Sequence, residues 1–160
     1  VRAVLAGGAD YGRSDQGRGQ RVQVEFVSAN PTGPLHIGHG RAAAFGDVLA
    51  SLLQWTGWQV TREYYVNDAL NSAQMALFGR SLYVRYQQVL GRDAALPADG
   101  YEGEYFDEIA QAIADREGDR FLSLPEQEAA RVFTHLALEQ MLAQQREDLR
   151  RFGVEFDVWF

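Results

Sequence analysis

One stretch constrains the fold more than any other part of the chain. Residues 22–39 read Val-Gln-Val-Glu-Phe-Val-Ser-Ala-Asn-Pro-Thr-Gly-Pro-Leu-His-Ile-Gly-His. Its first part alternates apolar and polar residues and then runs apolar, which predicts a central strand that ends at Asn30-Pro31. A proline-stiffened loop follows, and two histidines then flank a glycine where a helix is expected to begin. Because ligands of open α/β sheets bind beyond the carboxyl ends of strands, this order predicts a ligand site in the loop.

The hydrophobic spacing of the next segments completes a strand–helix–strand unit. Residues 40–55 follow helical spacing, and Gly57 is expected to end that helix. Residues 59–66 are rich in β-branched and aromatic side chains, which predicts a second strand. A unit of this kind within about 45 residues favours a parallel sheet. The large apolar residues of the helix fall on one side, namely Phe45, Val48, Leu49, Leu52 and Leu53.

The rest of the chain is predicted to be mainly helical. A helix is expected from Asp68, as its N-cap, to Leu90, followed by helices over 104–117 and 125–152. Gly153 is expected to end the last helix, and residues 154–160 read as a third strand. The predicted fold class is α/β, a Rossmann-like parallel sheet half-domain with a mainly helical insertion. The expected domain organisation is a linker over 1–21, a first βαβ unit over 22–68, a helical insertion over 69–153 and the third strand over 154–160.

Composition excludes several kinds of site and partner. The net charge of −7 argues against sequence-blind binding of nucleic acid, so DNA is not an expected partner. The sequence has neither an apolar run of about 18 residues nor a signal-peptide pattern, so no membrane partner is expected. The absence of cysteine excludes disulfides and thiolate metal sites and fits a cytoplasmic location. Because lysine is also absent, any phosphate must be bound by histidine and backbone amides.

The start of the predicted helix suits an anion. Its free N–H groups and positive dipole end point toward the preceding loop. His36 and His39 are three residues apart and can flank one ligand if both lie in the first turn, while Gly38 lets a flat base or sugar press against the backbone. Imidazoles would bind phosphate oxygens more tightly as charge builds up in a transition state. The alternatives are a structural or surface pair of histidines, and a zinc site, which would need more ligands than the distant His135 supplies.

The wider sequence resembles a known family. Residues 28–41, Ser-Ala-Asn-Pro-Thr-Gly-Pro-Leu-His-Ile-Gly-His-Gly-Arg, resemble the signature of class I aminoacyl-tRNA synthetases. The preceding Val-Glu-Phe-Val (24–27) narrows the resemblance to arginyl-tRNA synthetases of the bacterial type. The similarity continues in Tyr-Gly-Arg-Ser-Asp (11–15), Glu-Tyr-Tyr-Val-Asn-Asp (63–68), Gly-Tyr-Glu-Gly-Glu-Tyr (100–105) and Phe-Gly-Val-Glu-Phe-Asp-Val-Trp-Phe (152–160).

The resemblance implies a reaction and a set of roles. L-arginine and ATP would form arginyl-adenylate and pyrophosphate, and arginine would then pass to tRNA(Arg). His36 and His39 match the catalytic positions; the ATP-binding positions are His36, Gly38 and His39, with Pro31 and Gly33 in the loop. The arginine-binding positions are Glu25, Ser28, Ala29, Asn30 and His39. Mg²⁺ would arrive with ATP, and no protein-bound metal is expected.

Several assignments keep an alternative. Glu25 suits a planar guanidinium, but it could instead pair with a nearby arginine such as Arg41. Tyr64, Tyr65, Asn67 and Asp68 could line the site, or the tyrosines could be core residues and Asp68 a helix cap. Asp47 is expected on a solvated surface. For the whole chain, the alternatives are another nucleotidyltransferase with the same His-x-Gly-His logic, and a non-catalytic module, derived from a synthetase, that binds RNA or protein.

The resemblance also implies parts that this sequence does not contain. The family carries a second, lysine-rich signature loop, and this chain has no lysine. The chain is therefore expected to be a fragment that covers the first half of a catalytic domain, with activity expected only in the intact protein.

Overall fold

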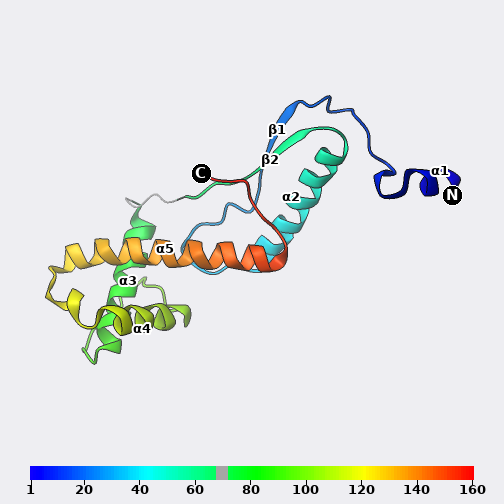
Figure 1. Cartoon of the computed structure of the whole chain (residues 1–160). Coiled ribbons are helices and arrows are strands. Elements are labelled where there is room, and N and C mark those ends of the chain that lie inside the picture. The colour runs from blue at the N-terminus through cyan, green and yellow to red at the C-terminus, as the bar shows by residue number, and fades with distance from the viewer. Residues whose placement is uncertain (68–71) are drawn as a thin grey trace. The chain divides into compact units, whose positions relative to one another are not determined.

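The computed structural model describes residues 1–67 and 72–160, and the chain divides into two compact units (Figure 1). The first unit comprises Val1–Ala29, Leu35–Asn67 and Arg146–Phe160, and the second comprises Asn30–Pro34 and Asp68–Gln145. Each unit has its own hydrophobic cluster. The domain organisation expected from the sequence stays a prediction. Within the described residues, no helix is both long enough and apolar enough to cross a membrane.

The sheet of the first unit is parallel, as predicted. It consists of β1 (Arg21–Glu25), β2 (Gln59–Tyr64) and β3 (Val158–Trp159), in the order β1-β2-β3. Glu25 pairs with Glu63, which in turn pairs with Val158, so the carboxyl ends of the strands meet at one edge. Among the described strands, β2 lies between β1 and β3, so the first strand, predicted to be central, pairs with β2 alone. The third strand is shorter than the predicted 154–160, since only its last residues reach β2.

Helix α2 (Ile37–Trp55) connects β1 to β2 (Figure 1). It buries its small residues rather than its large ones. Ala43, Gly46 and Ala50 are the buried residues of this helix. A Cβ at Gly46 would lie 2.2 Å from the Phe26 ring, so glycine permits this close approach. Phe45 is 74% exposed, and the predicted stripe of large apolar residues therefore does not face the core of the described unit.

Two glycines expected to end helices do so with the same hydrogen-bond pattern. At the end of α2, the Gly57 N–H donates to the Gln54 carbonyl and the Trp58 N–H donates to the Leu53 carbonyl, both at 3.1 Å. At the end of α5 (Glu126–Phe152), Gly153 and Val154 repeat this arrangement. These paired bonds form the Schellman motif, and both glycines have the positive φ that it requires.

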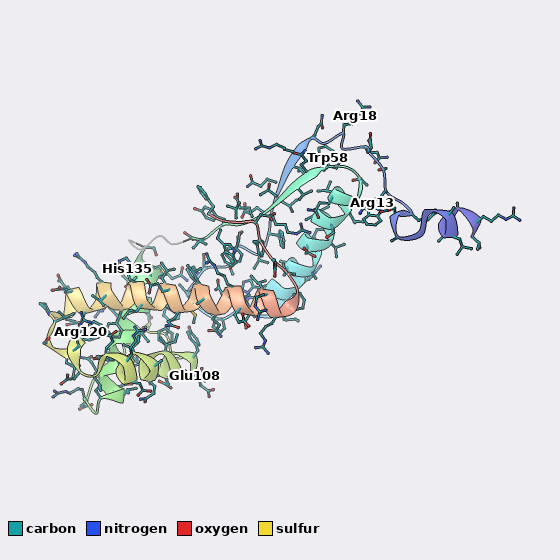
Figure 2. The ribbon with its side chains drawn as sticks, in the orientation of Figure 1. Arg13, Arg18, Trp58, Glu108, Arg120 and His135 are labelled. Atoms are coloured by element: carbon teal, nitrogen blue, oxygen red, sulfur yellow. The ribbon has the colours of Figure 1, made fainter. Side chains whose placement is uncertain are left out.

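The N-terminal segment lies along the turn between α2 and β2. It begins with α1 (Arg2–Gly7) and the 3₁₀ helix η1 (Gly8–Asp10), neither of which has a buried residue. Backbone hydrogen bonds then join residues 14–19 to residues 55–57. The Arg13 guanidinium lies 4.5 Å from the centre of the Trp55 ring, and Gly17 packs against Trp58. Figure 2 labels Arg13 and Trp58 in this part of the chain. Much of the predicted linker is therefore held against the first unit.

The second unit is helical and has an aromatic core. It contains α3 (Ala73–Val89), α4 (Tyr105–Glu117), the 3₁₀ helix η2 (Arg120–Ser123) and α5 up to Gln145. On α3, Phe78, Leu82 and Tyr86 are buried, and they pack with Phe106 and Phe133. Helix α3 begins later than predicted, because the Ser72 hydroxyl accepts the Met75 N–H as the N-cap. Asp68, the predicted cap, lies outside the described residues.

Candidate active site

The signature stretch is divided between the two units. Residues up to Ala29 and from Leu35 onward belong to the first unit, while Asn30–Pro34 belongs to the second. The structure therefore presents three separate pieces: a turn after β1, a histidine pair at the start of α2, and a loop held by the helices of the second unit.

His36 and His39 form a reciprocal cap at the start of α2. The Gly38 N–H donates to His36 Nδ1 at 3.1 Å, and the His36 N–H donates to His39 Nδ1 at 3.1 Å. This is the geometry of a capping box, with imidazole nitrogens in place of the usual side-chain oxygens. The two rings stack with their centroids 3.8 Å apart. The helix begins at Ile37, as expected from the motif, and both histidines lie in or next to its first turn.

The cap determines which ring atoms remain available to a ligand. Because each Nδ1 accepts a backbone N–H, the proton of each neutral ring lies on Nε2. Partial burial, and secondly the neighbouring His36, lower the pKa of His39 below its usual 6.5, so His39 is neutral at physiological pH. The arrangement therefore gives two Nε2–H donors beside the positive end of a helix dipole, which suits an anion.

Gly38 has a packing role within this cap. A Cβ at this position would lie 2.9 Å from Cε1 and 3.0 Å from Nδ1 of His36. The space beside Gly38 that the sequence suggested for a base or sugar is thus taken, on this side, by the His36 ring.

The turn after β1 contains two consecutive non-glycine residues in the left-handed region. Val27 has a φ of +66° and Ser28 has a φ of +40°. Such a conformation costs about 1–3 kcal/mol per residue and is a clear outlier for β-branched valine. The Ser28 hydroxyl donates to Glu25 Oε1 at 2.8 Å, and its oxygen accepts the Tyr65 N–H at 3.1 Å. Glu25 forms no ion pair with Arg41 or with any other residue that the structure describes.

Tyr64 is buried beneath the same turn rather than facing solvent. Its hydroxyl accepts the Ala29 N–H at 3.0 Å and lies 3.3 Å from the Ala29 carbonyl oxygen, to which it can donate. Burial raises the pKa of Tyr64 to about 12, against the opposing effect of the hydrogen bond to Ala29. Tyr64 therefore remains a neutral phenol that holds the backbone of a predicted arginine-binding residue.

The loop Asn30–Pro34 is held by side chains from distant parts of the second unit. The Gln145 amide donates to the Asn30 carbonyl at 3.2 Å and to the Gly33 carbonyl at 3.0 Å. The Tyr105 hydroxyl donates to the Thr32 carbonyl at 3.1 Å. Pro31 is fully buried, so its ring packs against protein. Sequence reasoning missed Gln145, although it is a polar residue in a buried row that recurs every fourth position of α5, namely Ala129, Phe133, Ala137, Met141, Gln145 and Leu149.

The other candidate residues lie in several places. Asn67 is exposed after β2, and Asp68 lies outside the described residues. Asp47 is not a solvated surface residue as expected, because Arg62 Nε donates to its carboxylate at 2.8 Å in a half-buried ion pair. His135 is exposed on α5. Among residues 1–67 and 72–160, no group of three or more histidine, aspartate or glutamate side chains is arranged to hold a metal ion.

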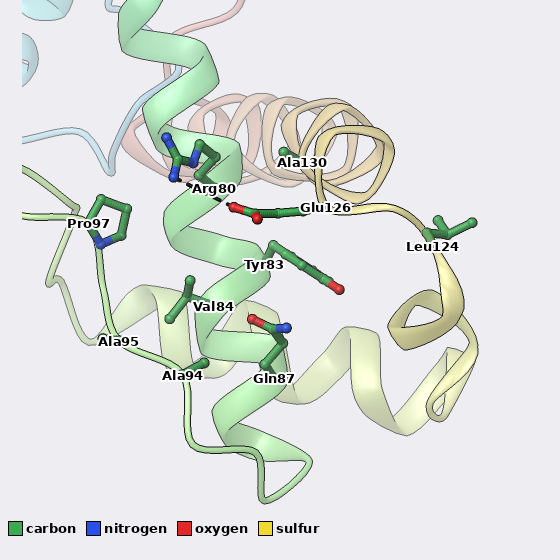
Figure 3. A pocket seen from close by; sticks show the side chains of 10 residues that line it. All are labelled: Arg80, Tyr83, Val84, Gln87, Ala94, Ala95, Pro97, Leu124, Glu126 and Ala130. Carbon is green, nitrogen blue, oxygen red and sulfur yellow. Dashed lines mark ion pairs between the residues drawn. The ribbon is translucent and has the colours of Figure 1, made fainter.

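Described residues of the second unit line two overlapping grooves, and none of the predicted site residues lines either one. The smaller groove, of about 340 Å³, is lined by residues from α3, the loop after it and the start of α5 (Figure 3). The larger groove, of about 860 Å³, shares Ala130 with the first groove, together with the charged residues Arg80 and Glu126. Those two side chains form an ion pair of 3.6 Å, but both are more than half exposed, so the pair contributes little stability. Neither groove gathers the residues that adenylate chemistry would use.

The parallel β1–α2–β2 unit, in which the N-terminus of α2 suits an anion, has the arrangement of α/β domains of the nucleotide-binding class. Residues 1–88 match the family model described as "tRNA synthetases class I (R), catalytic domain". The chain belongs to this family, the class I tRNA synthetases for arginine. The predicted family and the α/β, Rossmann-like fold class are thereby confirmed.

Similar proteins support the same assignment. The arginine–tRNA ligase of Anaeromyxobacter sp. (strain Fw109-5) is 50% identical over 157 residues, which are 98% of this chain and 26% of that protein. The arginine–tRNA ligase of Bacillus licheniformis is 50% identical over 160 residues, or 100% of this chain and 28% of that protein. A crystal structure named for an arginyl-tRNA synthetase from Campylobacter jejuni matches with a TM-score of 0.84 at 33% identity, covering 98% of this chain and 34% of the other. The chain thus spans about a quarter of the length of these curated relatives.

Proposed function

We propose that this chain forms part of an arginine–tRNA ligase. A carboxylate oxygen of L-arginine would attack the α-phosphorus of ATP, and the bond from that phosphorus to the oxygen bridging to the β-phosphate would break, releasing pyrophosphate. A hydroxyl of the terminal ribose of tRNA(Arg) would then attack the carbonyl carbon of arginyl-adenylate and release AMP. Membership of the family supports this proposal.

The reciprocal histidine cap is the observation that carries the proposal. Its two Nε2–H groups are held in place by hydrogen bonds made at the opposite side of each ring. Donors that are fixed before the reaction favour the transition state, in which negative charge grows on the oxygens around the α-phosphorus. The positive end of the α2 dipole acts in the same direction.

The remaining roles follow from the residue chemistry. The Glu25 carboxylate is exposed at the end of β1 and can accept two parallel N–H groups from a guanidinium, with Ser28, Ala29 and Asn30 completing the amino acid site. Pro31 and Gly33 shape the loop proposed to meet ATP. Mg²⁺ would arrive on the ATP phosphates, since hard divalent cations prefer such oxygen ligands. A cytoplasmic location is part of the same proposal.

Replacing His36 by asparagine tests the histidine role with the least disturbance of the fold. Asparagine is a good N-cap, so His36→Asn keeps an acceptor for the Gly38 N–H but removes the Nε2–H donor. In the full-length protein that carries this chain, arginine-dependent ATP–pyrophosphate exchange, measured with tRNA(Arg) present, should fall roughly 10²- to 10³-fold.

The matched control is His135→Ala, because His135 is exposed on α5 and lies in no part of the proposed machinery. Exchange in this variant should equal that of the wild type. A His36→Asn variant with wild-type exchange would remove the histidine role, and a wild-type protein without arginine-dependent exchange would refute the function. The 160-residue chain alone is expected to show little exchange. No separate observation favours a different nucleotidyltransferase or a non-catalytic module.

A further inference from the structure

The turn that follows β1 cannot keep its shape by backbone preference alone. Val27 and Ser28 both have positive φ, and neither is a glycine. Residues in this region persist only where the surrounding structure holds them, and they cluster at functional sites. The same turn carries Ser28, whose hydroxyl contacts the Glu25 carboxylate, so its shape also determines the orientation of Glu25.

The end of β2 supplies the contacts that hold this turn. The Tyr64 hydroxyl bonds to both the N–H and the carbonyl of Ala29. The next backbone N–H, that of Tyr65, donates to the Ser28 oxygen. A chain of hydrogen bonds therefore runs from β2 through Ser28 to Glu25.

Tyr64 is itself firmly placed. Its side chain is fully buried, and its ring stacks on Trp159 with a centroid distance of 4.1 Å. The Phe156 ring meets it edge-on at 5.3 Å. A buried polar group of this kind must be hydrogen-bonded, and here the hydroxyl meets both backbone polar groups of Ala29 in the turn.

We propose that Tyr64 is a positioning residue for arginine recognition, holding the strained turn so that Glu25 presents its carboxylate in one orientation. The Ser28 bond uses only one of the roughly four lone-pair sites of the carboxylate, which leaves it able to bind a guanidinium through two parallel N–H groups. Tyr64 acts without touching the substrate. This inference rests on the proposed function, because it names the group through which that function would select arginine.

Tyr64→Phe in the full-length protein tests the inference. The variant removes one hydroxyl and keeps the ring packing against Trp159 and Phe156. The KM for arginine in ATP–pyrophosphate exchange should rise about 3- to 10-fold, the effect of losing a hydrogen bond of ordinary strength, while the KM for ATP stays unchanged.

The chain offers a closely matched control in Tyr86→Phe. Tyr86 is also fully buried, and its hydroxyl likewise bridges two backbone groups, donating to the Gly118 carbonyl at 2.6 Å and accepting the Phe121 N–H at 3.4 Å. This variant should lose thermal stability without any change in the KM for arginine. If Tyr64→Phe behaves in the same way, Tyr64 is a core residue only and the inference is overturned.

A second measurement separates this inference from the proposed function. Val27→Gly relieves the strain, because glycine adopts positive φ readily. If Tyr64 holds the strained turn, Tyr64→Phe should lower the melting temperature less in the Val27→Gly background than in the wild type. Equal losses in both backgrounds would overturn the bracing role. Failure of the wild type to activate arginine would instead refute the proposed function and the substrate named here. That conclusion would hold whatever the melting temperatures of the variants show.

Discussion

Each histidine of the pair bonds the backbone through Nδ1 and leaves Nε2 for a ligand. Protonation at Nδ1 would remove the acceptor that the helix start uses. Separately, partial burial and then the neighbouring His36 lower the pKa of His39. Each histidine of the pair therefore combines a structural role with a proposed chemical one.

Stability should fall in mild acid because of His39. Its pKa is below 6.5 in the folded state, so the unfolded chain binds a proton at a pH where the folded chain does not. The contribution of His39 is complete above about pH 6.5 and is lost as the pH falls below that value. The free energy of unfolding in urea, measured between pH 5 and 8, should fall toward the acid end of this range. His39→Gln keeps an acceptor at this position of the capping box, and the fall should be smaller in this variant. An unchanged pH dependence in His39→Gln would contradict this assignment.

Residue types alone predicted the location of the histidine pair but not its form. The spacing of three residues suggested a shared first turn, and the helix does begin at Ile37, but histidine is not among the preferred N-caps, so the reciprocal cap itself was not predicted. The sequence does not predict the positive φ of Val27, because valine normally favours extended backbone. The role of Tyr64 depends on a partner 35 residues away, which no local pattern reveals.

At the scale of elements, α2 shows where hydrophobic periodicity fails. Periodicity gives most weight to large apolar residues, but the helix approaches the sheet through Ala43, Gly46 and Ala50. Close approach to Phe26 excludes larger side chains from that face. The strands, by contrast, were predicted with the correct parallel pairing, because β1, α2 and β2 follow one another with short connections.

Two glycines of α2 give a paired test of this packing. Gly46→Ala would place a Cβ 2.2 Å from the Phe26 ring and should destabilise the chain by about 1–3 kcal/mol, as overpacking does. Gly40→Ala is the control, because nothing lies within 4 Å of its added Cβ, and it should stabilise the helix by about 0.5–1 kcal/mol. Urea unfolding of both variants measures the difference. Equal effects in the two variants would show that α2 does not depend on close approach at Gly46.

At the scale of the whole molecule, charge and exposed apolar surface are unevenly distributed. The second unit carries thirteen acidic and six basic residues, whereas the first unit carries nine of each. The net charge of −7 thus belongs to the helical unit. The first unit instead exposes Phe45, Val48, Leu49 and Leu52, whose helical spacing places them on one face of α2.

This exposed face should make the 160-residue chain prone to self-association, since contiguous apolar patches favour it. The double variant Phe45→Gln and Leu52→Gln should bind less of the dye ANS and sediment more as a monomer than the wild type. Ala44→Gln changes an exposed small residue of the same helix and should leave both readings unchanged. If the double variant binds as much ANS as the wild type, the apolar surface that binds the dye does not lie on this face of α2.

The hydrogen bonds from Gln145 to the Asn30 and Gly33 carbonyls have a consequence for folding during synthesis. The two carbonyls precede Gln145 by 115 and 112 residues, so the ribosome completes the loop long before it reaches the side chain that fixes it. At roughly 5–20 residues per second, the interval is on the order of 10 s. During that time the nascent loop lacks these two hydrogen bonds and is open to proteases and chaperones. The loop can therefore take its final shape only after Gln145 has been synthesised.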